Sequence, residues 1–220
     1  MNTFNYSELA RLGVATVYEA SGRAGLIDID LHQIVPGSRV AGPARTVCCA
    51  QGDNLMMHAV LATVQPGEVL VLSMPEPAPV ALVGELLATQ ALVQHVAGLL
   101  IDASVRDVDE LRTLGLPIWS RFIRVRGATR TALGKLNIPV VVGGTQIHPG
   151  DVVVMDADGA VIVAQARVDD VLAAALARET REAENRSKFE AGILSIDLYG
   201  LREKVMGQLN EWGTDKQTDG

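Results

Sequence analysis

Residues 84–107, GELLATQALVQHVAGLLIDASVRD, decide the fold of this chain. The first half opens on Gly84-Glu85 and places apolar residues at helix-like intervals, so it predicts a helix; these residues are Leu86, Leu87, Ala91, Leu92 and Val93. The second half predicts a short buried strand at 99–101, and the strand ends on a polar corner made of Asp102, Ser104, Arg106 and Asp107. A helix that runs into a buried strand is typical of an α/β protein.

The two ends of this stretch carry side chains suited to binding a small acid. The first turn of the helix, Gly84–Leu87, offers unpaired backbone N–H groups and a partial positive charge to a carboxylate. Arg106 can clamp the same anion, and Asp107 can hold a hard divalent metal beside it. A bound anion, a guanidinium and a metal carboxylate together would stabilise an enolate.

Each of these residues also has a purely structural interpretation. Asp107 stands three residues before Glu110, so it can be the N-cap of a helix in a box-like arrangement. Arg106 can be a solvated surface charge, and Glu85 can be a first-turn acid that complements the helix dipole. Gly84 can simply permit a turn. Spacing alone leaves both interpretations open.

The flanking segments extend the α/β pattern on both sides. Before residue 84, a helix is predicted from 54 and a strand over 68–73, and the proline-rich segment 74–79 is expected to lead directly into Gly84. After Asp107, the helix DVDELRTL should end at Gly115. Residues 116–119 then predict a strand, and the next segment carries arginines that are either a solvated face or an attraction for carboxylates: Arg121, Arg124, Arg126 and Arg130.

The ends of the chain predict further elements around this unit. Two short helices, separated by Gly13, are predicted near the start. Valine-rich runs over 138–163 predict β-structure, with Asp158-Gly159 as a hairpin turn. A helix follows from Val168. We expect one domain over residues 1–206 and a polar tail over 207–220.

Composition narrows the class of protein. A chain of 220 residues that is 48% hydrophobic can bury one substantial core. The formal net charge of −7 offers no basic footprint for nucleic acid. The start has no signal-peptide pattern, and the most apolar segment, 80–101, contains Glu85 and His95, which argues against a membrane span. Cys48-Cys49 match no disulfide or metal pattern, so we expect small buried residues in a cytoplasmic protein.

The distribution of lysine and histidine favours metal chemistry over covalent chemistry. None of the lysines lies in an apolar pattern that would desolvate it, as a Schiff-base lysine requires. The four histidines share no ligand spacing: His32, His58, His95 and His148.

The chain resembles the divalent-metal pyruvate aldolases that cleave 4-hydroxy-4-methyl-2-oxoglutarate and 4-carboxy-4-hydroxy-2-oxoadipate, which share a fold with the regulator of ribonuclease activity A. The resemblance is carried by Gly84-Glu85-Leu86-Leu87, by Ile101-Asp102 and by Val105-Arg106-Asp107, and by stretches such as GDNLMMHAVLATVQPGEVLVL elsewhere. It covers most of the chain and fades after about Ser187. Ala103 departs from the pattern, in which a glycine commonly follows the aspartate.

This resemblance implies a fold, a reaction and a set of roles. The implied fold is a single α/β domain of the three-layer ββα swivelling type, in a homotrimer or homohexamer with sites between subunits. The implied reaction is aldol cleavage that releases pyruvate, in aromatic-acid catabolism, with oxaloacetate decarboxylation as a side activity. Mg²⁺ or Mn²⁺ would bind directly to Asp107, and Arg106 would face the 2-oxo group.

The resemblance also assigns three glutamates to this site. Glu19 and Glu182 would reach it across a subunit interface as catalytic residues. Together with Glu85 they are candidates to hold the metal through water. The alternative function is that of a non-catalytic regulator, which binds a ribonuclease through a surface and needs no metal.

Overall fold

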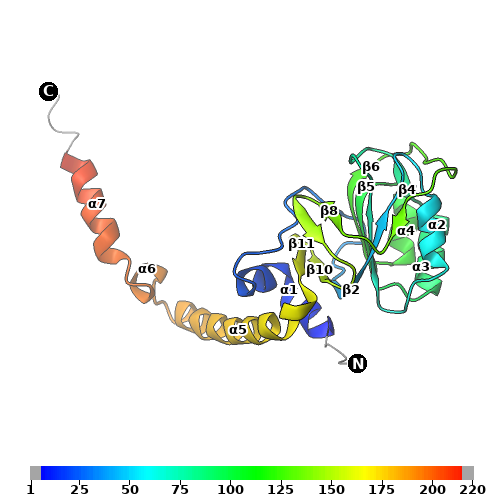
Figure 1. The fold of residues 1–220 in the computed structure, drawn as a ribbon. Coiled ribbons are helices and arrows are strands. Elements are labelled where there is room, and N and C mark those ends of the chain that lie inside the picture. The colour runs from blue at the N-terminus through cyan, green and yellow to red at the C-terminus, as the bar shows by residue number, and fades with distance from the viewer. Residues whose placement is uncertain (1–5, 215–220) are drawn as a thin grey trace, which may run out of the picture. The chain divides into compact units, whose positions relative to one another are not determined.

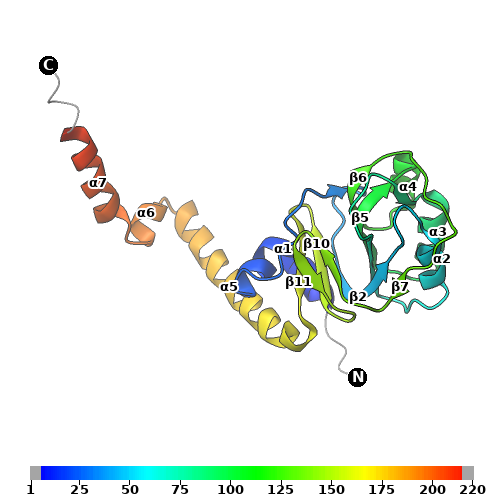
Figure 2. The same ribbon diagram turned by 45° about the horizontal axis from the view of Figure 1, so that its top comes forward.

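The computed structural model describes the backbone of residues 6–214 and the side chains of residues 6–208. The chain divides into two compact units, Met1–Leu176 and Ala177–Gly220. Among the described residues, no helix combines the length and the apolar character needed to cross a bilayer. The first unit carries the sheet and the residues discussed above, and it is shown in Figures 1 and 2.

The elements of the first unit follow the expected alternation of strands and helices. Its helices are α1 (Tyr6–Ala20), α2 (Leu55–Leu61), α3 (Glu85–Val93), α4 (Val108–Leu114) and the start of α5 (Val168–Glu190), with a 3-10 turn η1 (Gln165–Arg167). Its strands are β1 (His32–Gln33), β2 (Val40–Cys48), β3 (Val69–Ser73), β4 (Ala81–Val83), β5 (Gly98–Val105), β6 (Ile118–Ile123), β7 (Lys135–Leu136), β8 (Val140–Val142), β9 (Thr145–Ile147), β10 (Val152–Asp156) and β11 (Gly159–Val163).

The described strands form one large mixed sheet and one hairpin. The sheet has the order β1-β6-β5-β3-β2-β10-β11, with β4 beside β5 and β7 beside β2, and the hairpin is β8-β9. Strands β2, β3, β5 and β6 run parallel, and α2, α3 and α4 make the crossovers between them. Parallel strands need such crossovers and bury both faces, which explains why every residue of β3 and β5 is buried.

The elements stack in three layers, as the predicted ββα architecture requires. Helices α2, α3 and α4 cover one face, where they bury a cluster that includes Met57, Leu72, Leu99 and Ile101 (Figures 1 and 2). The opposite face of the parallel strands includes the buried Trp119, and it packs against the β8-β9 hairpin and against β10 and β11, which form the other end of the same sheet. The α/β fold class predicted from the sequence is confirmed.

Helix α1 is bent at Gly13, as the sequence predicts. Gly13 has φ 83° and ψ 166°, so it separates two helical segments. The backbone N–H of Val14, at the start of the second segment, donates to Asp156 Oδ2 at 2.9 Å. Because a Cβ on Gly13 would lie 2.7 Å from that same oxygen, glycine is required for both the conformation and the close approach.

Two local predictions are wrong. The segment after Pro79 does not lead directly into Gly84, because β4 pairs with β5 between them. Asp102 and Ser104 do not belong to a polar corner, because β5 continues to Val105 and buries both side chains. Asp102 is compensated by Arg121, whose Nη1 lies 3.0 Å from Asp102 Oδ1. Because the polar Asp102 and Ser104 interrupt the apolar run, the sequence pattern did not predict that the strand continues to Val105.

Helix α3 is confirmed, but most of the apolar residues that predicted it do not face the core. The small residues Ala88 and Ala91 face the core, whereas Leu86 is 81% exposed and Val93 is 65% exposed. A helix that is apolar on every side is normally covered on every side. The outer side of α3 therefore exposes apolar side chains.

The second unit is helical. It contains the end of α5 together with α6 (Ser195–Leu198) and α7 (Arg202–Thr214). The last fully buried residue of α5 is Ala175, next to the end of the first unit at Leu176. The expected domain boundary after residue 206 falls inside α7, and the region expected to be a tail is helical as far as Thr214. Residues 215–220 of that predicted tail lie outside the described residues.

Candidate active site

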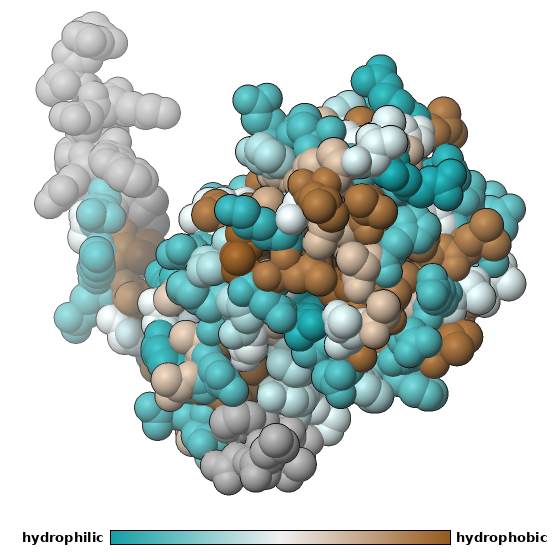
Figure 3. All heavy atoms as spheres, turned by 45° about the vertical axis from the view of Figure 1, so that its right-hand side comes forward, coloured by the Kyte–Doolittle hydropathy of each residue, from teal (hydrophilic) through white to brown (hydrophobic). Residues whose placement is uncertain are grey.

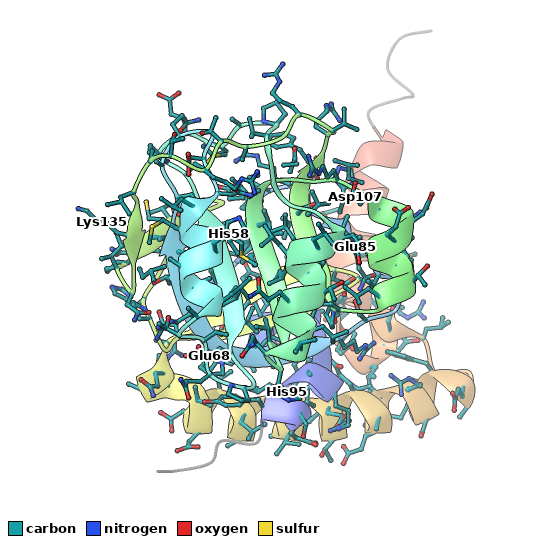
Figure 4. The ribbon with its side chains drawn as sticks, turned by 90° about the vertical axis from the view of Figure 1, so that its right-hand side faces the viewer. His58, Glu68, Glu85, His95, Asp107 and Lys135 are labelled. Atoms are coloured by element: carbon teal, nitrogen blue, oxygen red, sulfur yellow. The ribbon has the colours of Figure 1, made fainter. Side chains whose placement is uncertain are left out.

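A pocket of about 360 Å³ lies where β4 and β5 end and α2 and α3 begin. It is lined by Asn54, His58, Ala81, Leu82, Gly84, Leu86, Leu87, Gln90, Arg106, Asp107, Ala128 and Arg130. Figure 4 shows His58, Glu85 and Asp107 toward one end of the helical layer, with Glu68 and His95 at the other end. Ligands of α/β proteins gather outside the carboxyl ends of the parallel strands, which is the end described here.

The start of α3 faces the carboxylate of Asp107. The first bond inside the helix runs from the Ala88 N–H to the Gly84 carbonyl at 3.1 Å, so the N–H groups of residues 85–87 precede it. The N–H of Glu85 donates to Asp107 Oδ2 at 3.1 Å. The first N–H of this turn is therefore bonded to a carboxylate of the protein itself, and binding of a substrate carboxylate by the turn stays a prediction.

Asp107 does not cap its own helix with its side chain. It occupies the N-cap position of α4 with φ 61° and ψ 45°, in the left-handed region, and makes no side-chain capping hydrogen bond. The box-like arrangement with Glu110 is therefore wrong. A non-glycine residue held in this conformation is uncommon and is often found at functional sites. Here the conformation turns the carboxylate toward α3.

Arg106 extends along the pocket beside Asp107. Its Nε lies 3.6 Å from Asp107 Oδ2, and the two side chains are 48% and 42% exposed. A Cβ on Gly84 would lie 2.5 Å from Asp107 Oδ2 and 3.1 Å from Arg106 Nε, and a Cβ on Gly127 would lie 3.1 Å from Arg106 Nη1. Gly84 and Gly127 thus leave the space that the two charged side chains fill. Gly84 therefore does more than permit a turn, which was its purely structural interpretation.

None of the side chains of the three predicted glutamates lines this pocket within one chain. The Glu85 side chain accepts a hydrogen bond from Thr89 Oγ1 at 2.9 Å and lines a separate acidic groove with Asp109 and Glu110. Glu19, in α1, pairs with Arg23 at 3.2 Å. Glu182 belongs to the second unit, in α5, and pairs with Arg178 at 2.7 Å. A role for Glu19 and Glu182 across a subunit interface stays a prediction.

The structure adds four polar residues that the sequence did not single out as site residues: Asn54, His58, Gln90 and Arg130. Arg130 belongs to the arginine group for which a carboxylate-attracting role had been left open. The sequence pattern gave Asn54 only as a helix start and His58 only as one of four histidines without ligand spacing, because both lie far from residues 84–107 in sequence. Their i, i+4 spacing places them on one side of a helix, and this is the signal that could have paired them.

The donor set fits a metal held by one carboxylate. Among the described residues, no group of three or more His, Cys, Asp or Glu side chains could hold an ion. Mg²⁺ keeps several waters and commonly binds proteins through one or two carboxylates together with a substrate. Asp107 is partly exposed and borders the pocket, so it meets that description.

Comparisons with known proteins agree with this architecture. A relative from Halalkalibacterium halodurans, named "Putative 4-hydroxy-4-methyl-2-oxoglutarate aldolase", is 30% identical over 161 residues, which are 73% of this chain and 77% of the relative. The structure of Streptomyces coelicolor RraAS2, described as an unusual member of the RNase ES inhibitor RraA protein family, is 30% identical with a TM-score of 0.73, and the match covers 82% of this chain and 94% of that one.

A more distant solved structure carries the same family name. The RNA-processing inhibitor RraA from Thermus thermophilis is 26% identical with a TM-score of 0.57, over 60% of this chain and 80% of that one. The family described as "RraA-like: Aldolase/RraA" matches residues 14–162, a range that contains the whole pocket. The chain belongs to the RraA-like (Aldolase/RraA) family.

Proposed function

We propose that this protein is a divalent-metal-dependent aldolase that cleaves 4-hydroxy-4-methyl-2-oxoglutarate or 4-carboxy-4-hydroxy-2-oxoadipate and releases pyruvate. The observation that carries the proposal is the meeting of the α3 N-terminus, Arg106 and Asp107 in one pocket. The name of the Halalkalibacterium halodurans relative supports the same reaction class.

The pocket provides a position for the pyruvyl end of such a substrate. The backbone N–H groups of Leu86 and Leu87 precede the first intrahelical bond of α3, so they can donate to the C1 carboxylate. The Arg106 guanidinium, which borders the same pocket, would then face the 2-oxo group. Two directional contacts of this kind orient the bond to be broken.

The reaction needs charge stabilisation at one oxygen. A base removes the proton of the C4 hydroxyl, and the C4 oxygen becomes the carbonyl of the second product, which is pyruvate or oxaloacetate. As the bond between C3 and C4 breaks, its electron pair moves to the 2-oxo oxygen as the pyruvate enolate. Protonation at C3 then completes pyruvate. Arg106 would stabilise the developing negative charge on that oxygen, which is typically a large contribution to catalysis. Loss of CO₂ from oxaloacetate forms the same enolate, so we expect oxaloacetate decarboxylation as a side activity.

The proposed metal is Mg²⁺ or Mn²⁺, with Asp107 as its direct ligand. A bound divalent ion would act as a Lewis acid toward the 2-oxo group. The hydrogen bond from the Glu85 N–H holds the Asp107 carboxylate in place, and Arg106 lowers the local negative charge. Glu85, Glu19 and Glu182 remain proposed ligands through water, the last two from a neighbouring subunit.

The proposed assembly is a homotrimer or homohexamer. Its support is the outer side of α3, where Leu86, Leu92 and Val93 are 81%, 40% and 65% exposed. Figure 3 shows apolar patches on the surface that is turned toward the viewer. Because Leu86 also lines the pocket, a partner that covers this side of α3 would border the site.

A second candidate function is regulation of a ribonuclease. It is supported by the Streptomyces coelicolor and Thermus thermophilis relatives, whose descriptions name RNase ES inhibition and inhibition of RNA processing. A regulator of this kind uses a surface and needs no bound acid or metal.

A pyruvate-release assay separates the two functions. Purified protein would be supplied with oxaloacetate, 4-hydroxy-4-methyl-2-oxoglutarate and 4-carboxy-4-hydroxy-2-oxoadipate, each with Mg²⁺, with Mn²⁺ and with excess chelator. The aldolase proposal expects metal-dependent pyruvate formation that chelator stops. Absence of pyruvate from all three substrates with both metals would reject the proposal and favour the regulator.

A further inference from the structure

A second cavity, of about 320 Å³, lies in the first unit away from the candidate active site. It is bounded by the segment that follows α1, by β9 with the turn after it, and by the end of β11 with η1. The two cavities share no lining residue. Figures 1 and 2 show β11 and α2 on opposite sides of the first unit. A ligand in this cavity would therefore contact neither Arg106 nor Asp107.

Hydrogen bonds hold the walls of this cavity together. The Ile162 N–H, in β11, donates to the Gly25 carbonyl at 2.8 Å. Gly25 has φ 82°, and a Cβ there would collide with the Ile162 carbonyl, so only glycine allows this approach. The Thr145 hydroxyl, in β9, donates to the Leu26 carbonyl of the same segment. The cavity is thus formed before any ligand binds.

The Asp151 carboxylate fixes the third wall and orients His148. Asp151 is 8% exposed, and its Oδ1 accepts the N–H of Gln165, the first residue of η1, at 3.2 Å. Its Oδ2 accepts the His148 N–H at 2.8 Å and lies 3.4 Å from His148 Nδ1. Because Nδ1 faces the carboxylate, Nε2 is directed away from it. When the imidazole is protonated, Nε2 carries an N–H that can donate to a ligand.

Arg167 brings a guanidinium to the same cavity. Its Nη2 donates to the Ser21 carbonyl at 3.1 Å, which holds the guanidinium against the segment after α1. A guanidinium has five N–H donors in a fixed fork. In the part of the chain that the structure describes, the Arg167 side chain makes no further hydrogen bond or ion pair. The other donors are therefore available to a ligand.

The lining as a whole favours a small anion with an apolar part. Its charged side chains are Arg167, His148 when protonated, and Asp151, and the segment after α1 adds none. The negative charge of Asp151 is already stabilised by two backbone N–H groups and by the imidazole. A guanidinium with free donors is suited to a carboxylate. The apolar side chains of the lining are Ala24, Ile162, Val163 and Ala164.

We propose that this cavity is a second binding site, which takes the carboxylate of a small organic acid. We call it the β11 site. Arg167 forms the ion pair with the carboxylate, and protonated His148 donates to it from Nε2. Asp151 is the positioning residue that holds the imidazole. The short alkyl part of the ligand lies against the apolar lining. The site does not depend on the proposed aldolase chemistry, and pyruvate release tests that chemistry separately.

Histidine ring signals in NMR report on both cavities in one sample. His148 lines the β11 site, His58 lines the candidate active site, and His32 and His95 line neither. The probe is propanoate, and its control is propanamide, which has the same shape without the charge. At pH 6, below the ordinary histidine pKa of about 6.5, propanoate should shift the His148 signal saturably. We expect a Kd on the order of 1–10 mM for so small a ligand, and no saturable shift with propanamide.

Three variants, studied at constant ionic strength, assign the contacts. Arg167→Gln should raise the Kd reported by His148 about 10- to 100-fold, the range for a hydrogen bond to a charged group. Arg167→Lys keeps the charge and should raise the Kd less. Arg124→Gln is the matched control, because Arg124 is an exposed arginine outside both linings, and it should keep the wild-type Kd. Unchanged His32 and His95 signals verify that each variant is folded.

The pH dependence tests the role of His148. At pH 8 the neutral imidazole with its proton on Nδ1, toward Asp151, has no donor at Nε2. The wild type should then bind propanoate about 3- to 10-fold more weakly than at pH 6, the usual net value of one hydrogen bond. The same Kd at both pH values would show that His148 is not a donor to the ligand.

The remaining outcomes decide the β11 site itself. A His148 signal that does not saturate with propanoate, or that responds equally to propanamide, overturns the site. A wild-type Kd in Arg167→Gln overturns the ion pair on which the proposal rests. A shift of His58 alone would place the acid in the candidate active site and reject a second site.

Discussion

The backbone N–H of Glu85 donates a hydrogen bond to Asp107 Oδ2 at 3.1 Å, across 22 positions of sequence. This contact joins the start of α3 to Asp107, which follows Arg106 just after the end of β5. It requires the left-handed backbone of Asp107 and the missing side chain of Gly84. A change at any of the three residues therefore tests the same arrangement.

Asp107→Asn removes the negative charge of the side chain and keeps its shape. Asparagine tolerates the left-handed region and its amide oxygen can still accept the Glu85 N–H, so the unfolding free energy should stay within about 0.5 kcal/mol of wild type. Loss of the negative charge should lower metal-dependent pyruvate release by more than about 100-fold. Steady-state kinetics and urea unfolding measure the two effects. An Asp107→Asn protein that keeps wild-type turnover would reject Asp107 as the metal ligand.

Arg106→Lys keeps the positive charge and removes the planar fork. If the guanidinium contacts the developing enolate, kcat on oxaloacetate should fall about 100- to 1,000-fold at saturating Mg²⁺. A contact used only for binding would raise KM instead. Arg124→Lys is the control, because Arg124 is an exposed arginine whose Nη1 donates to the Ile123 carbonyl at 2.7 Å. Equal kinetics of the two variants would mean that Arg106 is a solvated charge.

Gly84→Ala tests the space around the two charged side chains. Gly84 has φ −131° and ψ −171°, an extended conformation open to any residue, so the backbone tolerates alanine. The new Cβ would lie 2.5 Å from Asp107 Oδ2, so the carboxylate must move away from the Glu85 N–H. We expect kcat to fall at least about 10-fold, since a 1 Å misplacement can cost more than this, with only a small change in Tm.

Gly207→Ala is the matched control for this change. A Cβ on Gly207 would meet nothing within 4 Å, so neither kcat nor the pocket should be affected. A Gly84→Ala protein with wild-type kcat would show that the Asp107 carboxylate can be displaced without consequence.

The buried Asp53 predicts a pH-dependent contribution to stability. Burial raises the pKa of Asp53, but hydrogen bonds from the Thr129 side chain and from three backbone N–H groups outweigh burial and lower the pKa. A carboxylate whose pKa is depressed in the folded state stabilises the fold above its unfolded pKa, about 3.9, and loses that contribution as the pH falls through the folded value. Asp53→Asn should therefore have a lower urea midpoint than wild type at pH 7 and at pH 5. The difference should shrink at pH 3. A difference that is the same at all three pH values would contradict the ionised state of Asp53.

The sequence determined the elements whose cause is local. The helix over residues 85–93, the end of α4 at Gly115 and the bend at Gly13 agree with the structure. The predicted hairpin also forms, but its turn is Ala157-Asp158 and not Asp158-Gly159, because Gly159 pairs with Asp156. Hydrophobic periodicity, turn residues and glycines determine the local structure over a few residues, so a sequence pattern can predict it. The grouping of Arg106 and Asp107 with the start of α3 was also predicted, with help from the family resemblance.

Only the tertiary structure decided which side chains meet. The apolar residues of α3 gave no indication that Ala88 and Ala91 would face the core. The full length of β5 could not be predicted, because it contains the buried Asp102, which is paired with the half-buried Arg121. Asp107 was ambiguous between a helix cap and a site residue until its backbone was seen to turn the carboxylate toward Glu85. Asp53 and the segment 129–132 are 76 or more positions apart, and their contact depends on the packing of the whole sheet. Contacts over such distances are set by the packing of the elements, which no local pattern records.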